Sequence, residues 1–543
     1  MNGNRHRLPH GLIAADKAVV AMAIRADVPT VYVNDHDRAT RDAWRVLSAA
    51  NRDEDATEFI FRYGDAPCRF EYNDEGKLAP GVLNSDRMRL RLNQIANWKR
   101  KEGAKVTAMT GAPRDVVSMV LAVPNPPLPL VTTLVDVPVF TPKGKVVTEP
   151  GYNADAKLFY SPARGLDVPT VPQRPKQADL ERARELIVDE LLADFPFKGD
   201  ADRAHAVCMF LQPFVRSLID GETPLYLSDA PTPGSGKGLL VRACSMVALG
   251  GEPTLMMPGP DEAEWRKRIT STLLSAPSIV LLDNITTMLD SGAFSALLTA
   301  PHWTDRLLGL NRNVTLPNRA EWVISGNNVS MSTELTRRTV RIVLDSGEEH
   351  PEDRPGNTFR HPDLLGWARG EARGELIWAA LVLGRYWVVK GRPPGRETMG
   401  SYEAWARVMG GILRTAGIDG LLTNRLEQRD QTGSEREQMI TFLDAWNGAH
   451  GSTRMKASDV SEAAWKVLGI DAWGDRAPVA MGFKLKQYAD RPFDGLVLRR
   501  AKREDGSLAT RGKSALWYVE PSADAPSPPG DEAASRVVRR RSK

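Results

Sequence analysis

The sequence predicts an α/β protein whose core is a parallel β-sheet covered by helices. Three observations carry this prediction. Residues 222–346 alternate short apolar strands with helical stretches, as parallel α/β sheets do. The first strand, 225–229, leads through a glycine-rich loop into a helix. Two later apolar strands, 277–284 and 321–328, end in polar side chains, which the carboxyl edge of such a sheet would bring together.

The composition is that of a globular protein with several domains. Its 543 residues suggest three or four domains at about 150 residues each. Lys and Arg (72) barely exceed Asp and Glu (68), so a nucleic-acid site must come from local charge rather than from the net +4. The three cysteines lie far apart, no apolar run is as long as a membrane span, and no secretory signal is visible. We therefore expect a cytoplasmic protein with no membrane partner.

Seven regions are predicted along the chain. They are an N-terminal α/β domain (1–160), a Pro-rich linker (161–176), a helical collar (177–221), a P-loop ATPase core (222–346), a helical subdomain (347–430), a winged-helix DNA-binding module (431–520) and a disordered basic tail (521–543). In the first domain, the apolar spacing predicts a helix over 86–99.

The winged-helix prediction rests on the order of elements after residue 430. A polar break at 428–433 precedes Ser434 and Glu437, which form a capping box that would open a helix. A second helix follows, and a third is expected over about 478–489. The apolar runs 496–500 and 515–519 then predict a β-hairpin.

The loop after the first core strand has the pattern of a phosphate-binding loop. Glycines let backbone N–H groups turn toward a phosphate, the helix N-terminus adds its positive dipole end, and a lysine adds a full charge. We predict that ATP, with Mg²⁺, binds here. The predicted ligands are Pro233, Gly234, Ser235, Gly236, Lys237, Gly238 and Leu239.

Two positions of this loop depart from the usual pattern. Pro231 stands where the first glycine is expected, and Gly238 stands where Ser or Thr would bind Mg²⁺. A water, Thr232 or Ser235 could take that place.

The next two strands supply candidate catalytic residues. Asp283 ends an apolar strand and would hold Mg²⁺ directly or through a water. Asn284 occupies the place where many ATPases have Glu, and an amide can orient water but cannot accept its proton. Asn327 ends the third strand, where it could contact both the γ-phosphate and the attacking water. The alternative for Asn327 is an ordinary turn at a strand end, where Asn is favoured.

Arg337 and Arg338 follow the third strand. Paired arginines in this place are candidates for an arginine finger that reaches a neighbouring subunit's nucleotide. The alternative is a solvated basic turn.

The order Gly-Ser-Gly-Lys, Leu-Leu-Asp-Asn, Ser-Gly-Asn-Asn, Arg-Arg resembles that of superfamily 3 helicases. It is similar above all to the AAA+-related primase-helicases of phages, plasmids and integrated elements. The resemblance runs over roughly residues 28–520. It implies a ring-shaped homohexamer, ATP bound between subunits, and single-stranded DNA in the central pore. No zinc-binding cysteine cluster or polymerase carboxylate set supports a primase activity.

Two places are expected to contact DNA. In the family, a hairpin between the second and third core strands touches the DNA backbone, and Arg312 lies at its expected tip. Basic residues on the third helix and the wing of the C-terminal module would meet duplex phosphates. These residues are Lys484, Lys486, Arg499, Arg500, Lys502 and Arg503. The alternatives are an exposed turn and a solubilising face.

We therefore expect an ATP-dependent DNA helicase or translocase of a mobile-element replication system. The alternative is a DNA-binding initiator or loader that uses ATP as an assembly switch with little hydrolysis, because Gly238 and Asn284 weaken the hydrolytic machinery. A third hypothesis is an ATPase of phage defence or packaging. For residues 28–160 we expect a collar or partner-docking domain.

Overall fold

The computed structural model divides the chain into two compact units, Met1–Leu422 and Thr423–Lys543. The residues it describes are 28–51, 59–73, 78–123, 125–285, 288–306, 313–348, 350–355, 359–460, 462–468, 481–482, 485–486, 488–490, 492–503, 505, 507–511 and 514–521. Within these residues, no helix combines the length and the apolar character needed to cross a membrane.

A five-stranded sheet forms the centre of the first unit, and all of its strand pairings are parallel. In spatial order its strands are β13 (Thr254–Leu255), β14 (Ile279–Ile285), β17 (Glu321–Asn327), β12 (Leu225–Ala230) and β18 (Thr339–Val343). The predicted parallel α/β sheet is confirmed. Because the strands run the same way, the carboxyl ends of β12, β14 and β17 meet at one edge.

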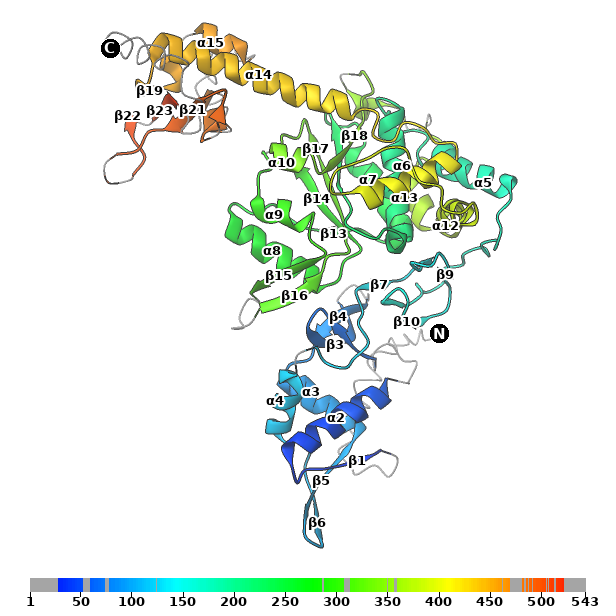
Figure 1. Ribbon diagram of the computed structural model, residues 1–543. Helices are drawn as coiled ribbons and strands as arrows, with labels where there is room; N and C mark the ends of the chain where they lie inside the picture. The colour runs from blue at the N-terminus through cyan, green and yellow to red at the C-terminus, as the bar shows by residue number, and fades with distance from the viewer. Residues whose placement is uncertain are drawn as a thin grey trace, which may run out of the picture. The chain divides into compact units, whose positions relative to one another are not determined.

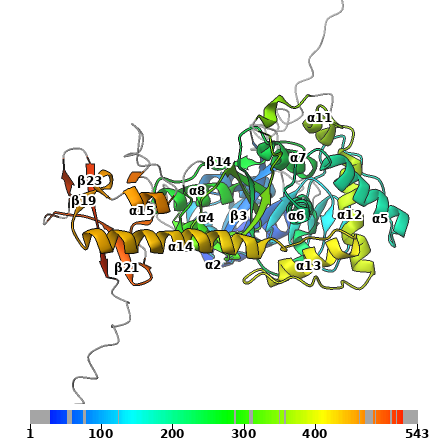
Figure 2. The same ribbon diagram turned by 90° about the horizontal axis from the view of Figure 1, so that it is seen from above.

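Helices cover both faces of this sheet (Figures 1 and 2). Successive residues of a strand point to opposite faces, so Tyr226 packs with one group of helices and Leu227 with the other. The first group is α6 (Asp200–Val215), α7 (Lys237–Leu249), α12 (Arg373–Val389) and α13 (Glu403–Thr415). The second is α8 (Glu262–Leu274) and α9 (Gly292–Leu297). The sheet is therefore the middle layer of three.

Shorter elements connect these layers. They are α5 (Gln177–Arg184), a π-helix (Glu185–Leu191), 3₁₀ turns at Arg216–Leu218 and Pro351–Asp353, the hairpin β15 (His302–Arg306) and β16 (Asn313–Pro317), α10 (Thr333–Thr336) and α11 (Leu364–Arg369).

The N-terminal region has a hydrophobic cluster of its own. Its helices are α2 (His36–Ala50), α3 (Ser85–Ile95) and α4 (Arg114–Ala122), and its first sheet is β1 (Thr30–Tyr32), β5 (Asn97–Glu102) and β6 (Lys105–Ala108). The predicted helix over 86–99 is wrong beyond Ile95. The chain turns into β5 there, where Trp98 lies opposite Val31 in the core.

Three small sheets complete this region. They comprise β2 (Ile60–Tyr63), β3 (Ala66–Tyr72) and β4 (Leu78–Val82); β7 (Thr133–Val135), β10 (Gly151–Asn153) and β11 (Leu158–Tyr160); and β8 (Val139–Phe140) with β9 (Val146–Val147).

The second unit has a separate core that includes Phe442, Trp446, Trp465 and Trp517. Its elements are α14 (Arg425–His450), β19 (Met455–Lys456), a 3₁₀ turn (Ala457–Asp459), α15 (Glu462–Val467), β20 (Pro492–Phe493), β21 (Leu496–Arg500), β22 (Thr510–Arg511) and β23 (Ser514–Pro521). The antiparallel pairing of β21 with β23 confirms the predicted hairpin. Half of the predicted third helix, including Lys484, lies outside the described residues.

The predicted polar break at 428–433 is wrong, because α14 runs through it without interruption. The stretch is polar, but its two Gln residues and its Arg are good helix formers, and a single glycine such as Gly433 costs a helix only about 1 kcal/mol. Ser434 and Glu437 therefore lie inside the helix and do not cap its start.

Candidate nucleotide-binding site

The loop between β12 and α7 has the backbone that a phosphate-binding loop requires. Gly234 and Gly236 adopt φ angles of +77° and +90°, which residues with a Cβ rarely adopt. Gly236 is the N-cap of α7, so Lys237 is the first residue of the helix. Ser235 is buried, and its hydroxyl donates to the Thr232 carbonyl at 2.7 Å. Leu239 follows in the first turn of α7 and exposes its side chain.

Lys237 lies at the base of this loop with few partners. Its side chain is buried, and its one hydrogen bond within the described part of the chain is a long one, of 3.3 Å, from Nζ to the Thr232 carbonyl. Burial lowers the pKa of the ammonium, while the carboxylates of Asp229 and Asp283 oppose this shift. A phosphate at the loop would give the ammonium a strong partner.

Asp283 and Asn284 form the exposed end of β14. The pairing of β14 with β17 is irregular between Leu282 and Ile285, and Asn284 has a left-handed φ of +53°. Ser325 of β17 fills this irregularity. Its hydroxyl donates a short hydrogen bond to Oδ1 of Asp283 and accepts one, at 3.2 Å, from the backbone N–H of Asn284. Ser325 thus orients both residues, and sequence reasoning did not identify it.

Asn327 ends β17 directly opposite Ala230, the last residue of β12. Its amide nitrogen, Nδ2, is buried and has no hydrogen-bond partner among the residues that the structure describes. Leaving a buried donor without an acceptor costs about 1–3 kcal/mol, so this amide is poised for an acceptor from a ligand. The next residue, Asn328, donates to the Pro231 carbonyl at 3.2 Å and holds the turn against the loop.

Gly238 lies beside the carboxylate of Asp283. A Cβ at Gly238 would be 3.9 Å from Oδ1 of Asp283, and no other heavy atom outside the neighbouring backbone would lie within 4 Å. Lys237, Asp283 and Asn327 therefore fit a nucleotide phosphate chain with a divalent cation, while the hydroxyl that would complete the cation shell is missing.

An ion pair lies directly beneath the loop. Arg341 of β18 donates to Oδ2 of the buried Asp229 through Nε (3.0 Å) and Nη2 (2.5 Å). The other oxygen, Oδ1, accepts the backbone N–H groups of Ala230 (2.9 Å) and Val329 (3.4 Å). One carboxylate thus joins β12, β18 and the turn after β17.

Arg337 and Arg338 lie at the opposite edge of the sheet. They precede β18, and the carbonyl of Arg338 accepts the N–H of Leu225, the first residue of β12. A strand rises about 3.3 Å per residue, so the length of β12 separates them from the loop that follows it. Both pair with Glu334. Arg337 is exposed, and Arg338 is largely buried.

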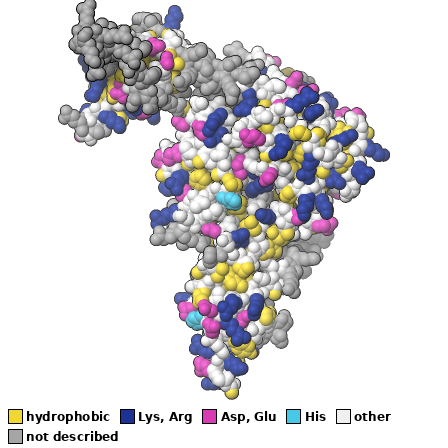
Figure 3. All heavy atoms as spheres, viewed as in Figure 1, with side chains coloured by type: hydrophobic (Ala, Val, Ile, Leu, Met, Phe, Trp, Pro, Cys, Tyr) yellow, Lys and Arg dark blue, Asp and Glu magenta, His cyan; other side chains and the backbone are white. Residues whose placement is uncertain are grey.

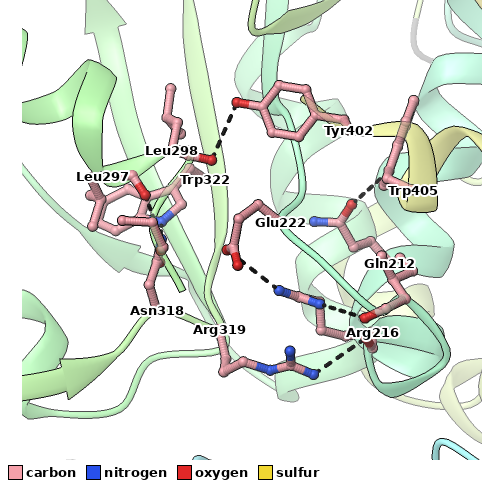
Figure 4. A network of polar contacts seen from close by, with 12 residues as sticks. Gln212, Arg216, Glu222, Leu297, Leu298, Asn318, Arg319, Trp322, Tyr402 and Trp405 are labelled. Atoms are coloured by element: carbon pink, nitrogen blue, oxygen red, sulfur yellow. Dashed lines mark hydrogen bonds and ion pairs between the residues drawn. The ribbon is translucent and has the colours of Figure 1, made fainter. Parts of the chain in front are cut away.

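A buried polar network occupies the same amino edge (Figure 4). Arg319 donates to the carbonyl of Arg216 at 3.4 Å, and Glu222 is 3.9 Å from Nη2 of Arg216. Burial lowers the pKa of the Arg216 guanidinium to about 9, and the nearby charge of Arg319 acts in the same direction. Gln212 accepts from both Tyr226 and Trp405 at 3.0 Å. This network joins α6 and α13 to the sheet.

The predicted DNA-binding residues differ in exposure and in whether they already have partners. A hairpin, β15–β16, does lie between β14 and β17, but Arg312, which was expected at its tip, is outside the described residues. In the second unit, Lys486, Lys502 and Arg503 are exposed. Arg499 is engaged by Asp490 and Glu520, each at 2.8 Å. Arg500 lies over the ring of Trp517, 5.7 Å from its centroid.

Comparisons with known proteins give weak likeness to helicase structures. No family model and no curated protein matches the chain. Among solved structures, "SCCmec type IV Cch - active helicase" is 12% identical with a TM-score of 0.31, and the match covers 84% of this chain and 90% of that one. The NrS-1 C-terminal region is 12% identical with a TM-score of 0.26, covering 77% and 92%. JCV helicase is 13% identical with a TM-score of 0.21, covering 47% and 61%. These scores are too low to carry an argument about fold or function.

Proposed function

We propose that this protein is an ATP-dependent DNA helicase or translocase of a phage or mobile-element replication system. The observation that carries the proposal is the partnerless amide of Asn327, which ends its strand beside the phosphate-loop strand. Lys237 and Asp283 lie at this same carboxyl edge. An ammonium, a carboxylate and a free amide donor are the groups that ATP hydrolysis needs together.

Each residue has a role that its position supports. Lys237 binds the β- and γ-phosphates, and Asp283, oriented by Ser325, holds Mg²⁺. Bound Mg²⁺ would neutralise charge on the phosphates. Asn327 donates to the γ-phosphate or positions the attacking water. Asn284 can hold that water but cannot accept its proton, so another acceptor must take it.

The arginines at the amino edge support a site shared between subunits. Arg337 and Arg338 are separated from their own loop by the length of the sheet, so a nucleotide that they contact would be bound to a neighbouring copy. We propose that copies associate into a homohexameric ring of the AAA+ type, with single-stranded DNA in its pore. The second unit, with its β21–β23 hairpin and exposed Lys502 and Arg503, would be the winged-helix module that contacts duplex DNA.

The alternative function is an ATP-switched replication initiator or loader. Gly238 and Asn284 favour it, since each removes a group that speeds hydrolysis in other ATPases. Such a protein would bind ATP and assemble on DNA with little turnover.

A DNA-stimulated ATPase assay on the full chain separates these functions. The helicase proposal predicts turnover that DNA increases and that Lys237→Ala abolishes, with an unchanged melting temperature. Lys198→Ala, a change at an exposed lysine nearby in the fold, is the matched control. ATP binding without turnover would favour the loader, and turnover unaffected by Lys237→Ala would refute both.

A further inference from the structure

A two-stranded β-ribbon extends from the N-terminal region. β5 and β6 are antiparallel, with Lys99 opposite Ala108 at one end and Glu102 opposite Lys105 at the other. β1 pairs only with the first three residues of β5, Asn97 to Lys99. All of β6 is exposed, as is β5 from Arg100 onward. The ribbon is the hairpin labelled β5 and β6 at the bottom of Figure 1. A hairpin with no face to bury adds little to stability, so the ribbon contributes little to the fold itself.

The ribbon carries strong positive charge. It contains four basic residues and one acidic residue, which are Lys99, Arg100, Lys101 and Lys105, and Glu102. None of these four basic side chains forms an ion pair within the described part of the chain. Figure 3 shows lysine and arginine side chains, with some acidic ones, on this lower part of the surface. The charges are therefore available to an anionic partner.

One face of the ribbon combines cations with an aromatic ring. Tyr32 lies directly beside Lys99 in the parallel pairing of β1 with β5, so both point to the same face. Lys101 shares that face because strand side chains alternate, and it follows Lys99 by about 7 Å. Tyr32 is 43% exposed, whereas Val31 and Trp98 on the opposite face are buried.

We propose that this face, formed by Tyr32, Lys99 and Lys101, binds a single-stranded polynucleotide. The two ammonium groups contact successive backbone phosphates, and a base stacks on the ring of Tyr32. A line of cations beside an exposed aromatic ring is the combination that binds single strands without sequence preference. An acidic protein segment would satisfy the lysines but would give the tyrosine ring no stacking partner. The site is separate from the proposed nucleotide site and needs no ATP.

Fluorescence anisotropy of the full chain with labelled oligo-dT and oligo-rU, without nucleotide, tests this site. Lys99→Glu with Lys101→Glu should weaken binding at least tenfold. It should also make the log-log salt slope shallower by about 1.4, since each phosphate contact on a single strand contributes about 0.7. The control is Lys143→Glu with Lys145→Glu, which has the same spacing and the same charge change at exposed lysines, although Lys143 pairs with Asp155 at 3.0 Å.

Tyrosine variants separate stacking from charge. Tyr32→Phe should bind like the unchanged chain, while Tyr32→Ala should bind about tenfold more weakly with the same salt slope. Oligo-dT containing bromodeoxyuridine should crosslink to Tyr32 in the unchanged chain, which tests the contact even if Tyr32→Ala does not fold. Equal weakening by the control pair, unchanged affinity in the ribbon variants, or crosslinks only elsewhere would overturn the site. Preference for oligo-dT or oligo-rU identifies the natural polymer. Because the assay contains no ATP, its result does not depend on ATPase activity.

Discussion

The hydroxyl of Ser325 donates a hydrogen bond to Asp283 across two neighbouring strands, and it accepts another from the backbone of Asn284. The candidate metal ligand and the residue beside the expected water are therefore positioned by one side chain. This arrangement makes Ser325 a positioning residue for the proposed hydrolysis.

Ser325→Ala should weaken Mg²⁺ use without unfolding the protein. Removing the hydroxyl frees the Asp283 carboxylate to rotate, and such losses around metal ligands typically cost 10- to 100-fold in metal affinity. A Mg²⁺ titration of ATPase activity should shift to higher concentrations by about that factor. Ser245→Ala, at a buried serine whose hydroxyl donates to the carbonyl of Val241 in its own helix, is the control and should leave the titration unchanged.

Gly238→Thr should strengthen the proposed metal site. The open space beside Asp283 accommodates a Cβ, and a hydroxyl there would supply the missing oxygen ligand. We expect a lower Mg²⁺ requirement and ATP turnover that is unchanged or several-fold higher. Gly238→Ala fills the same space without an oxygen, so a matching gain in that variant would contradict the explanation.

Mixing experiments should show that Arg337 and Arg338 act on the nucleotide of a neighbouring subunit. Arg337→Ala with Arg338→Ala should bind ATP but hydrolyse it poorly, by about 10³-fold if either is a finger. Mixed with Lys237→Ala subunits, it should regain part of the activity, because one subunit supplies the loop and the other the arginines. Glu334→Gln keeps both arginine side chains but removes the carboxylate that pairs with them, so it shows whether that pairing affects hydrolysis. Absence of rescue over a range of protein concentrations would place the arginines outside the catalytic machinery.

A fragment of residues 423–521 should fold and bind duplex DNA in a salt-dependent way. Neutralising Lys502 and Arg503 should lower affinity and make the salt slope shallower by about 1.8, since each duplex phosphate contact contributes about 0.9. Arg499→Gln should change the slope little, because Asp490 and Glu520 already balance its charge. A fragment that folds but does not bind duplex at low salt would rule out the winged-helix role.

The buried carboxyl of Glu321 should make stability depend on pH. Burial raises its pKa well above the ordinary value, and no group in the described ranges forms a hydrogen bond with its Oε2. The stability that this group contributes is complete below its unfolded pKa of about 4.3 and is lost as the pH rises toward the folded value. Glu321→Gln stays neutral, so its gain in melting temperature over the unchanged chain should grow from pH 5 to pH 8.

The pKa of the exposed Glu334 is shifted in the opposite direction to that of Glu321. Its hydrogen bond to Arg337, together with Arg338, lowers its pKa, so Glu334→Gln should not stabilise the protein at pH 8. A pH-independent effect of Glu321→Gln would show that this carboxyl titrates normally in the fold.

Local sequence was sufficient to predict the loop and the strands that surround it. The glycines at 234 and 236 and the apolar runs before Asp283 and Asn327 are short patterns of consecutive residues. Such local patterns can be recognised in the sequence without knowing how the chain folds. Ser325 was missed, although strand alternation places it on the same side as Asn327 and could have identified it. The Asp229–Arg341 ion pair could not be predicted from the sequence. It forms because β18 lies beside β12, and the sequence does not give this order of the strands. The end of α3 was missed because Trp98 suits a helix and a strand equally.

The order of the strands has a consequence for synthesis. β12 lies between β17 and β18, which are both made much later than the loop that β12 precedes. On the ribosome, β12 emerges before either of the strands that pair with it. Its apolar residues therefore stay unburied until β17 and β18 have been synthesised. Nonlocal parallel pairings of this kind form slowly and leave unpaired strand edges exposed. A chain truncated before Thr339 would therefore carry the complete loop sequence and yet be prone to aggregate, and chaperones would need to protect the nascent chain until the last strand is released.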